Sequence, residues 1–164
     1  MKTLLLMRHA KSSWGNSALS DHERPLNKRG ERACRLMGSF LNEQGLIPGK
    51  VICSTAVRAR KTVEGLLEKL SVEGDVDFSQ ELYHADVDIL LGHLQVLPNG
   101  IEVVMLVGHN PSMDEFLEVM CDEQDHMPTA AIAEIEFDIQ NWHDLTDQTA
   151  AQLKNLWKPK EIQS

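Results

Sequence analysis

The chain of 164 residues has few cysteines and no long apolar segment. Its three cysteines, Cys34, Cys53 and Cys121, form no CxxC pair, which argues against a zinc or dithiol redox site and predicts reduced, mostly buried thiols. No apolar run approaches the roughly 20 residues that span a bilayer. The N-terminal run leads straight into charged residues, unlike a signal peptide. We therefore expect a cytoplasmic protein that does not bind membranes.

Positive charge is also scarce. The chain has 16 Lys and Arg against 25 Asp and Glu, a formal net charge of −9 at pH 7. This balance argues against nonspecific nucleic-acid binding, and it means that any anion site must be a local positive pocket. The length and the hydrophobic content of 42% predict one globular domain over residues 1–164 with a substantial core.

Two apolar runs each end in a histidine. Residues 4–9 read Leu-Leu-Leu-Met-Arg-His, and residues 103–109 read Val-Val-Met-Leu-Val-Gly-His. If both runs are buried strands of an open α/β sheet, they carry Arg8, His9 and His109 to the carboxyl ends of the strands, where such sheets keep their ligand crevices. Imidazoles and a guanidinium at one sheet edge predict an anion site, above all one for phosphate.

A third short strand precedes another basic segment, residues 54–60, which reads Ser-Thr-Ala-Val-Arg-Ala-Arg and includes Arg58. Ser54 and Thr55 are candidate caps for the helix that follows, and Asn-Pro-Ser at 110–112 opens a later helix. Because the free N–H groups of helix N-termini favour anions, both helix starts support the same interpretation.

Strands and helices alternate along the chain. Apolar runs bounded by turn residues predict five strands, at Lys2–Arg8, Lys50–Ser54, Val76–Phe78, Val103–Val107 and Ile132–Phe137. Apolar residues at helical spacing predict four helices, at Asn27–Gln44, Ala56–Leu70, Asp86–Leu97 and Ser112–Cys121. This order is typical of a three-layer α/β/α sandwich with a mostly parallel central sheet. Beyond Phe137, the pattern permits either an amphipathic helix over 140–156 or a turn and an edge strand near Leu153–Trp157.

The motifs around these residues resemble those of one known family. Arg8-His9-Ala10 is similar to the Arg-His-Gly signature of the histidine phosphatase superfamily, the phosphoglycerate-mutase-like enzymes. Further similarities follow in the family's order over roughly residues 2–138: Ser12, Trp14, Arg24-Pro25-Leu26 with Gly30, the segment 54–59, Thr62 and Gly108-His109-Asn110.

Two positions depart from the family pattern. Ala10 replaces the glycine of the signature, which requires that the backbone there is not left-handed. Gly15 stands where mutases often place a phosphate-contacting asparagine, and Asn16 comes one residue late.

The resemblance implies a phosphoglycerate-mutase-like fold and assigns roles. His9 resembles the nucleophile that becomes phosphohistidine, and Arg8, Arg58 and His109 resemble the clamp on the phosphoryl oxygens. Ser12 and Asn110 are expected to contribute to substrate binding. For the proton donor, Glu81 is the best positional match after the third strand, and the alternatives are Asp86 and His84.

The expected reaction is metal-independent and needs no cofactor, because positioning and charge stabilisation are the main demands of phosphoryl transfer. Arg58 follows His9 by 49 residues, and His109 follows Arg58 by 51, which leaves little room for a lid in either interval. A shallow, open site suits a phosphorylated protein, so phosphohistidine on a protein is the first expected substrate, and the small phosphohistidine phosphatase branch is the closest resemblance. A phosphatase of small phosphate esters and a phospho-partner binding module without turnover are the alternatives. The oligomeric state stays open.

Overall fold

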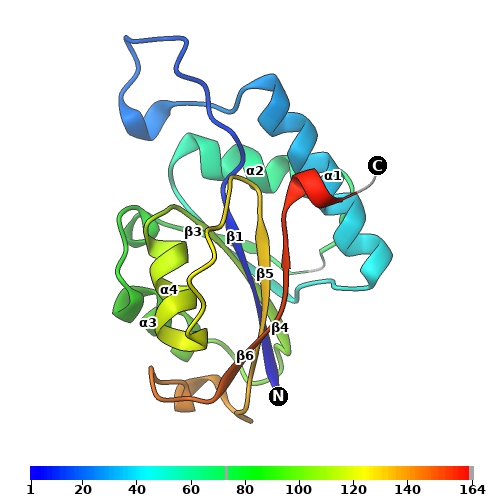
Figure 1. Cartoon of the computed structure of the whole chain (residues 1–164), viewed down its shortest axis with the longest axis vertical. Coiled ribbons are helices and arrows are strands. Elements are labelled where there is room, and N and C mark those ends of the chain that lie inside the picture. Colours follow the sequence, from blue (N-terminus) through cyan, green and yellow to red (C-terminus); the bar gives the residue numbers. More distant parts are fainter. Residues whose placement is uncertain (73, 163–164) are drawn as a thin grey trace.

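A six-stranded sheet lies between two layers of helices in the computed structural model, which describes residues 1–72 and 74–162 (Figure 1). The strands follow the order β3-β2-β4-β1-β5-β6 across the sheet. They span Lys2–Arg8 (β1), Lys50–Ser54 (β2), Val76–Ser79 (β3), Val103–Gly108 (β4), Ile132–Phe137 (β5) and Ala151–Trp157 (β6). The first four are parallel to one another, whereas β5 runs antiparallel to β1, and β6 at the sheet edge runs antiparallel to β5.

Two helices cover each face of the sheet. One layer contains α1 (Lys28–Gln44) and α2 (Val57–Leu67), and the other contains α3 (Val87–Gln95) and α4 (Ser112–Cys121). Alternate residues of a strand point to opposite faces, and β1 therefore contributes Leu4 and Leu6 to one core cluster and Leu5 and Met7 to the other. Both faces of β1 are buried, which explains its continuous apolar run. The predicted sandwich with a mostly parallel sheet is confirmed.

Side chains cap two of the helices, and the start of a third differs from the prediction. The side chains of Asn27 and Asp86 cap α1 and α3 by accepting backbone N–H bonds. For α2, the prediction that Ser54 or Thr55 is the cap was wrong, because Ala56 occupies that position. Ser54 is the last residue of β2, and its hydroxyl lies 3.2 Å from the Ala56 nitrogen and 2.8 Å from His109. Because α2 begins only at Val57, Ser54 and Thr55 both lie before the cap position.

The segment after β5 forms a short 3₁₀ turn at Trp142–Asp144 and then the edge strand β6. The alternative of a turn and a strand is therefore correct, and that of a helix over 140–156 is wrong. Trp142 explains the choice, because its ring is fully buried and its indole N–H donates to the Ile101 carbonyl at 2.7 Å. No helix in the described part of the chain is long and apolar enough to cross a membrane.

Candidate active site

Two neighbouring parallel strands carry the two histidines to one edge of the sheet. Arg8 at the end of β1 pairs with Gly108 at the end of β4, so His9 and His109 are the next residues on adjacent strands. Their ring centroids lie 5.1 Å apart, and both side chains are buried. The backbone N–H of His9 donates to the Gly108 carbonyl at 3.0 Å, which fixes the two strand ends together.

The His9 ring is held in one tautomer. Its Nδ1 lies 2.7 Å from the Ala10 carbonyl oxygen, which can only accept, so Nδ1 carries the proton and Nε2 is left with a lone pair. The Nε–H of Arg58 points at that lone pair from 3.3 Å. Burial, followed by the positive charges of Arg58, Arg8 and Arg24, lowers the pKa of His9 from 6.5 to about 4. At pH 7 the ring is therefore neutral and its Nε2 can act as a nucleophile.

His109 is also neutral, and one of its ring nitrogens has no partner. Burial lowers its pKa to about 3, with further contributions from the neighbouring His9 and Arg58. Its Nε2 lies 2.8 Å from the Ser54 hydroxyl, whereas Nδ1 is buried and has no hydrogen-bond partner in the described structure. If the hydroxyl donates to Nε2, then Nδ1–H is available to a ligand oxygen, and such a ligand would satisfy the unpaired group.

A carboxylate orients two guanidinium groups at this edge. Arg58 donates to the backbone oxygen of Asp21 at 2.6 Å and to its carboxylate at 3.0 Å, and Arg24 donates to the same carboxylate at 3.1 Å. The Tyr83 hydroxyl also bonds to it. These bonds, that of Tyr83 first, hold the pKa of Asp21 well below its usual value. Each terminal nitrogen of Arg58 keeps a second hydrogen for another acceptor.

Arg8 is the third guanidinium. One of its terminal nitrogens donates to the Met127 carbonyl at 3.1 Å, and the Asn110 amide donates to the same oxygen at 3.1 Å. The Arg8 Nε is buried without a partner in the described structure, so it too has a bond to offer to a ligand. Ala130 supports this region from a left-handed conformation, with φ of 66°, in which its N–H reaches the carbonyls of Arg8 and His9.

The substitution of alanine for the glycine of the family signature fits the backbone. Ala10 is not among the described residues with positive φ, so the condition stated for it from the sequence is met. Its N–H donates to the Thr62 hydroxyl at 2.9 Å, and that hydroxyl donates to the Arg58 carbonyl at 2.7 Å. Thr62 therefore ties the segment that carries the nucleophile to the helix that carries Arg58.

These groups surround a cavity of about 240 Å³ at the carboxyl ends of β1 and β4. Its lining comprises Arg8, His9, Lys11, Ser12, Trp14, Arg24, Arg58, His109, Asn110 and Thr129. Six of the residues predicted from the sequence thus come together: Arg8, His9, Ser12, Arg58, His109 and Asn110. The described lining contains four basic side chains and no carboxylate, which makes it a local positive pocket in an acidic protein.

The predicted proton donors lie elsewhere. Glu81 is exposed and does not line the cavity, and its carboxylate lies 3.3 Å from His93 Nε2. Asp86 caps α3, and His84 is exposed with φ of 65°. Asn16, offered as a substitute for the missing asparagine, is exposed and outside the lining. The role of Glu81 as proton donor stays a prediction, because Glu81 is not among the residues that line the cavity.

Four of the lining residues were not among the predicted site residues: Lys11, Trp14, Arg24 and Thr129. The guanidinium carbon of Arg24 lies 3.4 Å from the centroid of the Trp14 ring, and its NH1 donates to Ser12 at 2.8 Å. Arg24 sits in a polar loop without periodicity, so only its place in the motif Arg24-Pro25-Leu26 could have indicated it. Ser54 was given only a capping role, and its contact with His109 joins strands that are distant in sequence.

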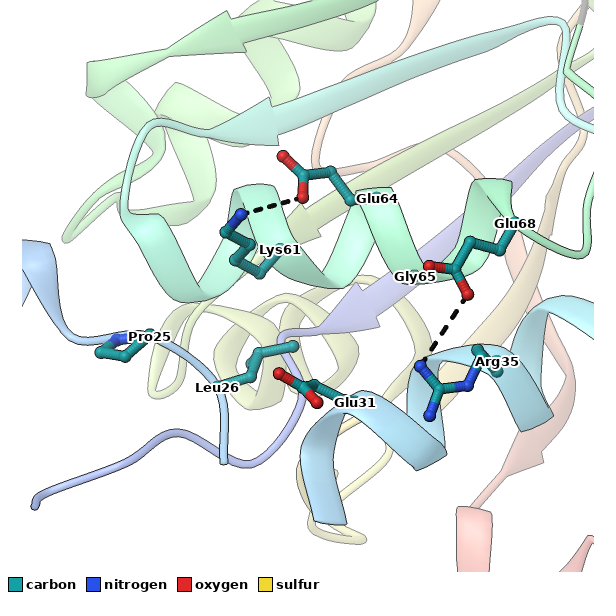
Figure 2. Close-up of a pocket in the computed structure, with 8 residues that line it drawn as sticks. All are labelled: Pro25, Leu26, Glu31, Arg35, Lys61, Glu64, Gly65 and Glu68. Atoms are coloured by element: carbon teal, nitrogen blue, oxygen red, sulfur yellow. Dashed lines mark hydrogen bonds and ion pairs between the residues drawn. The ribbon is translucent and has the colours of Figure 1, made fainter. Parts of the chain in front are cut away.

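In another hollow, between α1 and α2, the positive side chains are paired with carboxylates, in contrast to the cavity around His9 (Figure 2). Lys61 pairs with Glu64 at 3.1 Å, and Arg35 faces Glu68 at 3.8 Å. A further carboxylate, Glu31, lines the same hollow. Since its carboxylates outnumber its cations, this hollow does not suit an anion. Among the described residues, no group of three or more His, Cys, Asp or Glu side chains is placed to hold a metal ion.

Comparison with known proteins agrees with this site. Residues 4–92 match the histidine phosphatase superfamily (branch 1). The chain is 29% identical to phosphohistidine phosphatase SixA of Escherichia coli over 139 residues, which cover 82% of this chain and 85% of that protein. An uncharacterized protein of Mycobacterium leprae is 34% identical over 110 residues, and the match spans about two thirds of each protein, 65% of this chain and 66% of the relative.

Solved structures give the same result over nearly the full length. A protein of Nakamurella multipartitia, provisionally named phosphohistidine phosphatase SixA, superposes with a TM-score of 0.84 at 29% identity, with 96% of each chain covered. A SixA structure with tungstate shares the fold with a TM-score of 0.83 at 24% identity, over 96% of this chain and 97% of that chain. The chain therefore belongs to the histidine phosphatase superfamily, in the branch of small SixA-like phosphatases.

Proposed function

We propose that this protein is a metal-independent phosphatase that removes phosphate from phosphohistidine on a protein through a phosphohistidine intermediate at His9. The observation that carries the proposal is the lone pair of His9 Nε2, which lies on a neutral, buried ring within a cavity lined by basic side chains. A nucleophile next to preorganised positive charge is what phosphoryl transfer requires.

In the first step, His9 Nε2 attacks phosphorus, and the bond between phosphorus and the substrate nitrogen breaks. The leaving imidazole takes the bonding electron pair and departs neutral when its other nitrogen carries a proton. A phosphohistidine substrate therefore makes little demand on a general acid, which accords with a described lining that holds no carboxylate. The Ala10 carbonyl stabilises the positive charge that develops on the His9 ring through the bond at Nδ1.

In the second step, water attacks the phosphorus of phospho-His9 and the nitrogen–phosphorus bond breaks. The products are neutral His9 and dihydrogen phosphate, which releases a proton to solvent at neutral pH. Arg8, Arg58 and the Nδ1–H of His109 bind the phosphoryl oxygens in both steps and stabilise the negative charge that is spread over these oxygens in the transition state. The free hydrogens of Arg58 and the two unpartnered nitrogens provide these bonds.

The cavity geometry supports a protein substrate. The cavity is small, and Trp14 at its lining is 76% exposed, so an imidazole attached to a protein surface can enter while its backbone stays outside. The name of the Escherichia coli relative, phosphohistidine phosphatase, supports the same substrate.

The test is steady-state hydrolysis of a phosphohistidine-bearing protein beside a panel of small phosphate esters. We expect a higher kcat/KM for the phosphohistidine protein, and we expect His9→Ala to abolish turnover. His126→Ala is the matched control, since it removes an exposed imidazole outside the cavity lining. A preference for one small ester would reject the protein substrate and keep the chemistry. Near-normal rates in His9→Ala would reject the nucleophile, and failure to turn over any substrate would favour a phosphate-binding module.

A further inference from the structure

A second hollow, of about 410 Å³, opens beside the catalytic cavity. Lys11 and Thr129 belong to the linings of both, so the two hollows are immediate neighbours. We call the second hollow the basic groove. Its walls come from the first turns of α1, the segment around Pro128 and the 3₁₀ turn Pro159–Glu161, and Figure 1 shows this last turn beside α1.

The basic groove combines an apolar floor with a cationic rim. Ala33, Pro128 and Pro159 provide the apolar surface. The charged side chains that line it are four cations and one carboxylate: Lys11, Arg29, Lys158, Lys160 and Glu161. This excess of positive charge stands out in a chain whose formal net charge is −9.

Most of this positive charge is not compensated. Lys158 pairs with Asp125 at 3.0 Å. Within residues 1–72 and 74–162, by contrast, Lys11, Arg29 and Lys160 form no ion pair. The hollow of Figure 2 differs in this respect, since both of its cations, Lys61 and Arg35, form ion pairs with carboxylates. The cations of the basic groove are therefore available to an external anion.

We propose that the basic groove binds an acidic segment of the protein substrate, next to the phosphorylated side chain that enters the catalytic cavity. This inference rests on the proposed function and extends it to the choice of substrate. Because the basic groove shares Lys11 and Thr129 with the catalytic cavity, a segment bound in it lies next to the residue that enters the cavity, and the apolar floor can contact its side-chain stems. Charge complementarity at such a rim gives specificity for the correct partner and speeds association.

The experiment measures peptide binding in the absence of turnover. The full chain carrying His9→Ala is titrated into two fluorescent phosphoserine peptides that are equal in length, one with acidic and one with neutral residues beside the phosphoserine. Phosphoserine keeps the ligand stable, and anisotropy gives Kd. We expect the acidic peptide to bind on the order of tenfold more tightly at low salt, and we expect this advantage to shrink as ionic strength rises.

A charge-reversal pair tests the location. Arg29→Glu with Lys160→Glu should remove the advantage of the acidic peptide, because both side chains line the basic groove and neither lines the catalytic cavity. Arg32→Glu with Lys69→Glu is the matched control, since these residues line a different hollow along α1 and change the net charge equally. We expect the control to retain the preference.

The outcomes distinguish failure of the basic groove from failure of the proposed function. Equal binding of the two peptides, or equal loss in both variant pairs, would overturn the proposal. Binding of a DNA duplex as tightly as the acidic peptide would overturn the assignment to a protein segment. In the enzyme with His9 intact, kcat/KM for free phosphohistidine should not change in Arg29→Glu with Lys160→Glu. If no phosphohistidine substrate is hydrolysed but the peptide preference persists, the proposed function fails and the docking surface stands.

Discussion

Burial of His9 as a neutral ring should make the stability of this protein depend on pH in a defined window. The folded pKa of about 4 lies below the unfolded value of 6.5, so the unfolded chain binds a proton that the folded chain refuses between these limits. Above pH 6.5 the ring has no effect. As the pH falls from 6.5 to 4, the free energy of unfolding decreases, and below pH 4 this decrease stops.

The size of the effect follows from the same pKa. One pKa unit corresponds to about 1.4 kcal/mol, so His9 should destabilise the fold by roughly 3 kcal/mol at pH 4 relative to pH 7. The side chain is only 7% exposed, so solvent screening removes little of this value. His109 adds a similar loss that extends to pH 3, but the two losses are not additive, because His9 itself contributes to the shift of His109. The lowered pKa of Asp21 acts below pH 3.8, outside the window of His9.

The perturbation is His9→Asn, which keeps a side-chain amide able to donate to the Ala10 carbonyl and cannot titrate. Urea unfolding followed by circular dichroism between pH 4 and pH 7.5 gives the free energy of unfolding of both proteins. We expect the wild type to lose about 3 kcal/mol more than the variant over this range. His143→Asn, which removes an exposed imidazole, should follow the wild type. Parallel curves for wild type and His9→Asn would refute the argument that the nucleophile is kept neutral by burial.

Other substitutions probe the supports of the site. Arg58→Ala should remove on the order of 3 kcal/mol of transition-state stabilisation, which lowers kcat/KM by about two orders of magnitude. An unchanged kcat/KM would show that Arg58 does not bind the phosphoryl group. Ser54→Ala should cost roughly 1 kcal/mol of stability in thermal unfolding, since it leaves the Nε2 of His109 without its partner. Gly30→Ala should destabilise by roughly 1–3 kcal/mol, because the added Cβ would lie 2.2 Å from the Lys11 carbonyl oxygen; a neutral result would show that α1 can move away. EDTA should leave turnover unchanged, and inhibition reversed by added metal would contradict the metal-independent mechanism.

The central part of the site could be predicted because it lies on the ends of buried strands. An apolar run that stops at Arg8 and His9 defines both the strand and the point where it leaves the core, and the same holds for Gly108 and His109. Parallel pairing of the two strands then brings the histidines together. The points where the two strands end are local features, so the sequence pattern contains them.

The parts that escaped prediction depend on contacts between distant segments. Asp21 and Arg24 lie in a loop whose sequence has no periodicity. Only the folded chain shows that Asp21 accepts from Arg58, 37 positions further along the chain, as well as from Arg24. Ser54 was predicted to cap α2, but Ala56 is the cap residue and the Ser54 hydroxyl contacts His109, which is 55 positions away. For Glu81, position after a strand was not enough, because its carboxylate contacts His93 instead of the cavity.

The contacts of Asp21 explain how a cluster of positive groups can persist in the free protein. Arg58 and Arg24 approach the same cavity, and without a counter-charge their mutual repulsion would favour rotamers directed into solvent. Asp21 accepts from both and leaves hydrogens of Arg58 unused, so it fixes the guanidiniums in place and still allows them to bind a phosphoryl group. The two imidazoles need no counter-charge, because burial keeps them neutral. The site can therefore hold a nucleophile and a charge clamp side by side, since one carboxylate already orients Arg58 and Arg24, and the Met127 carbonyl holds Arg8.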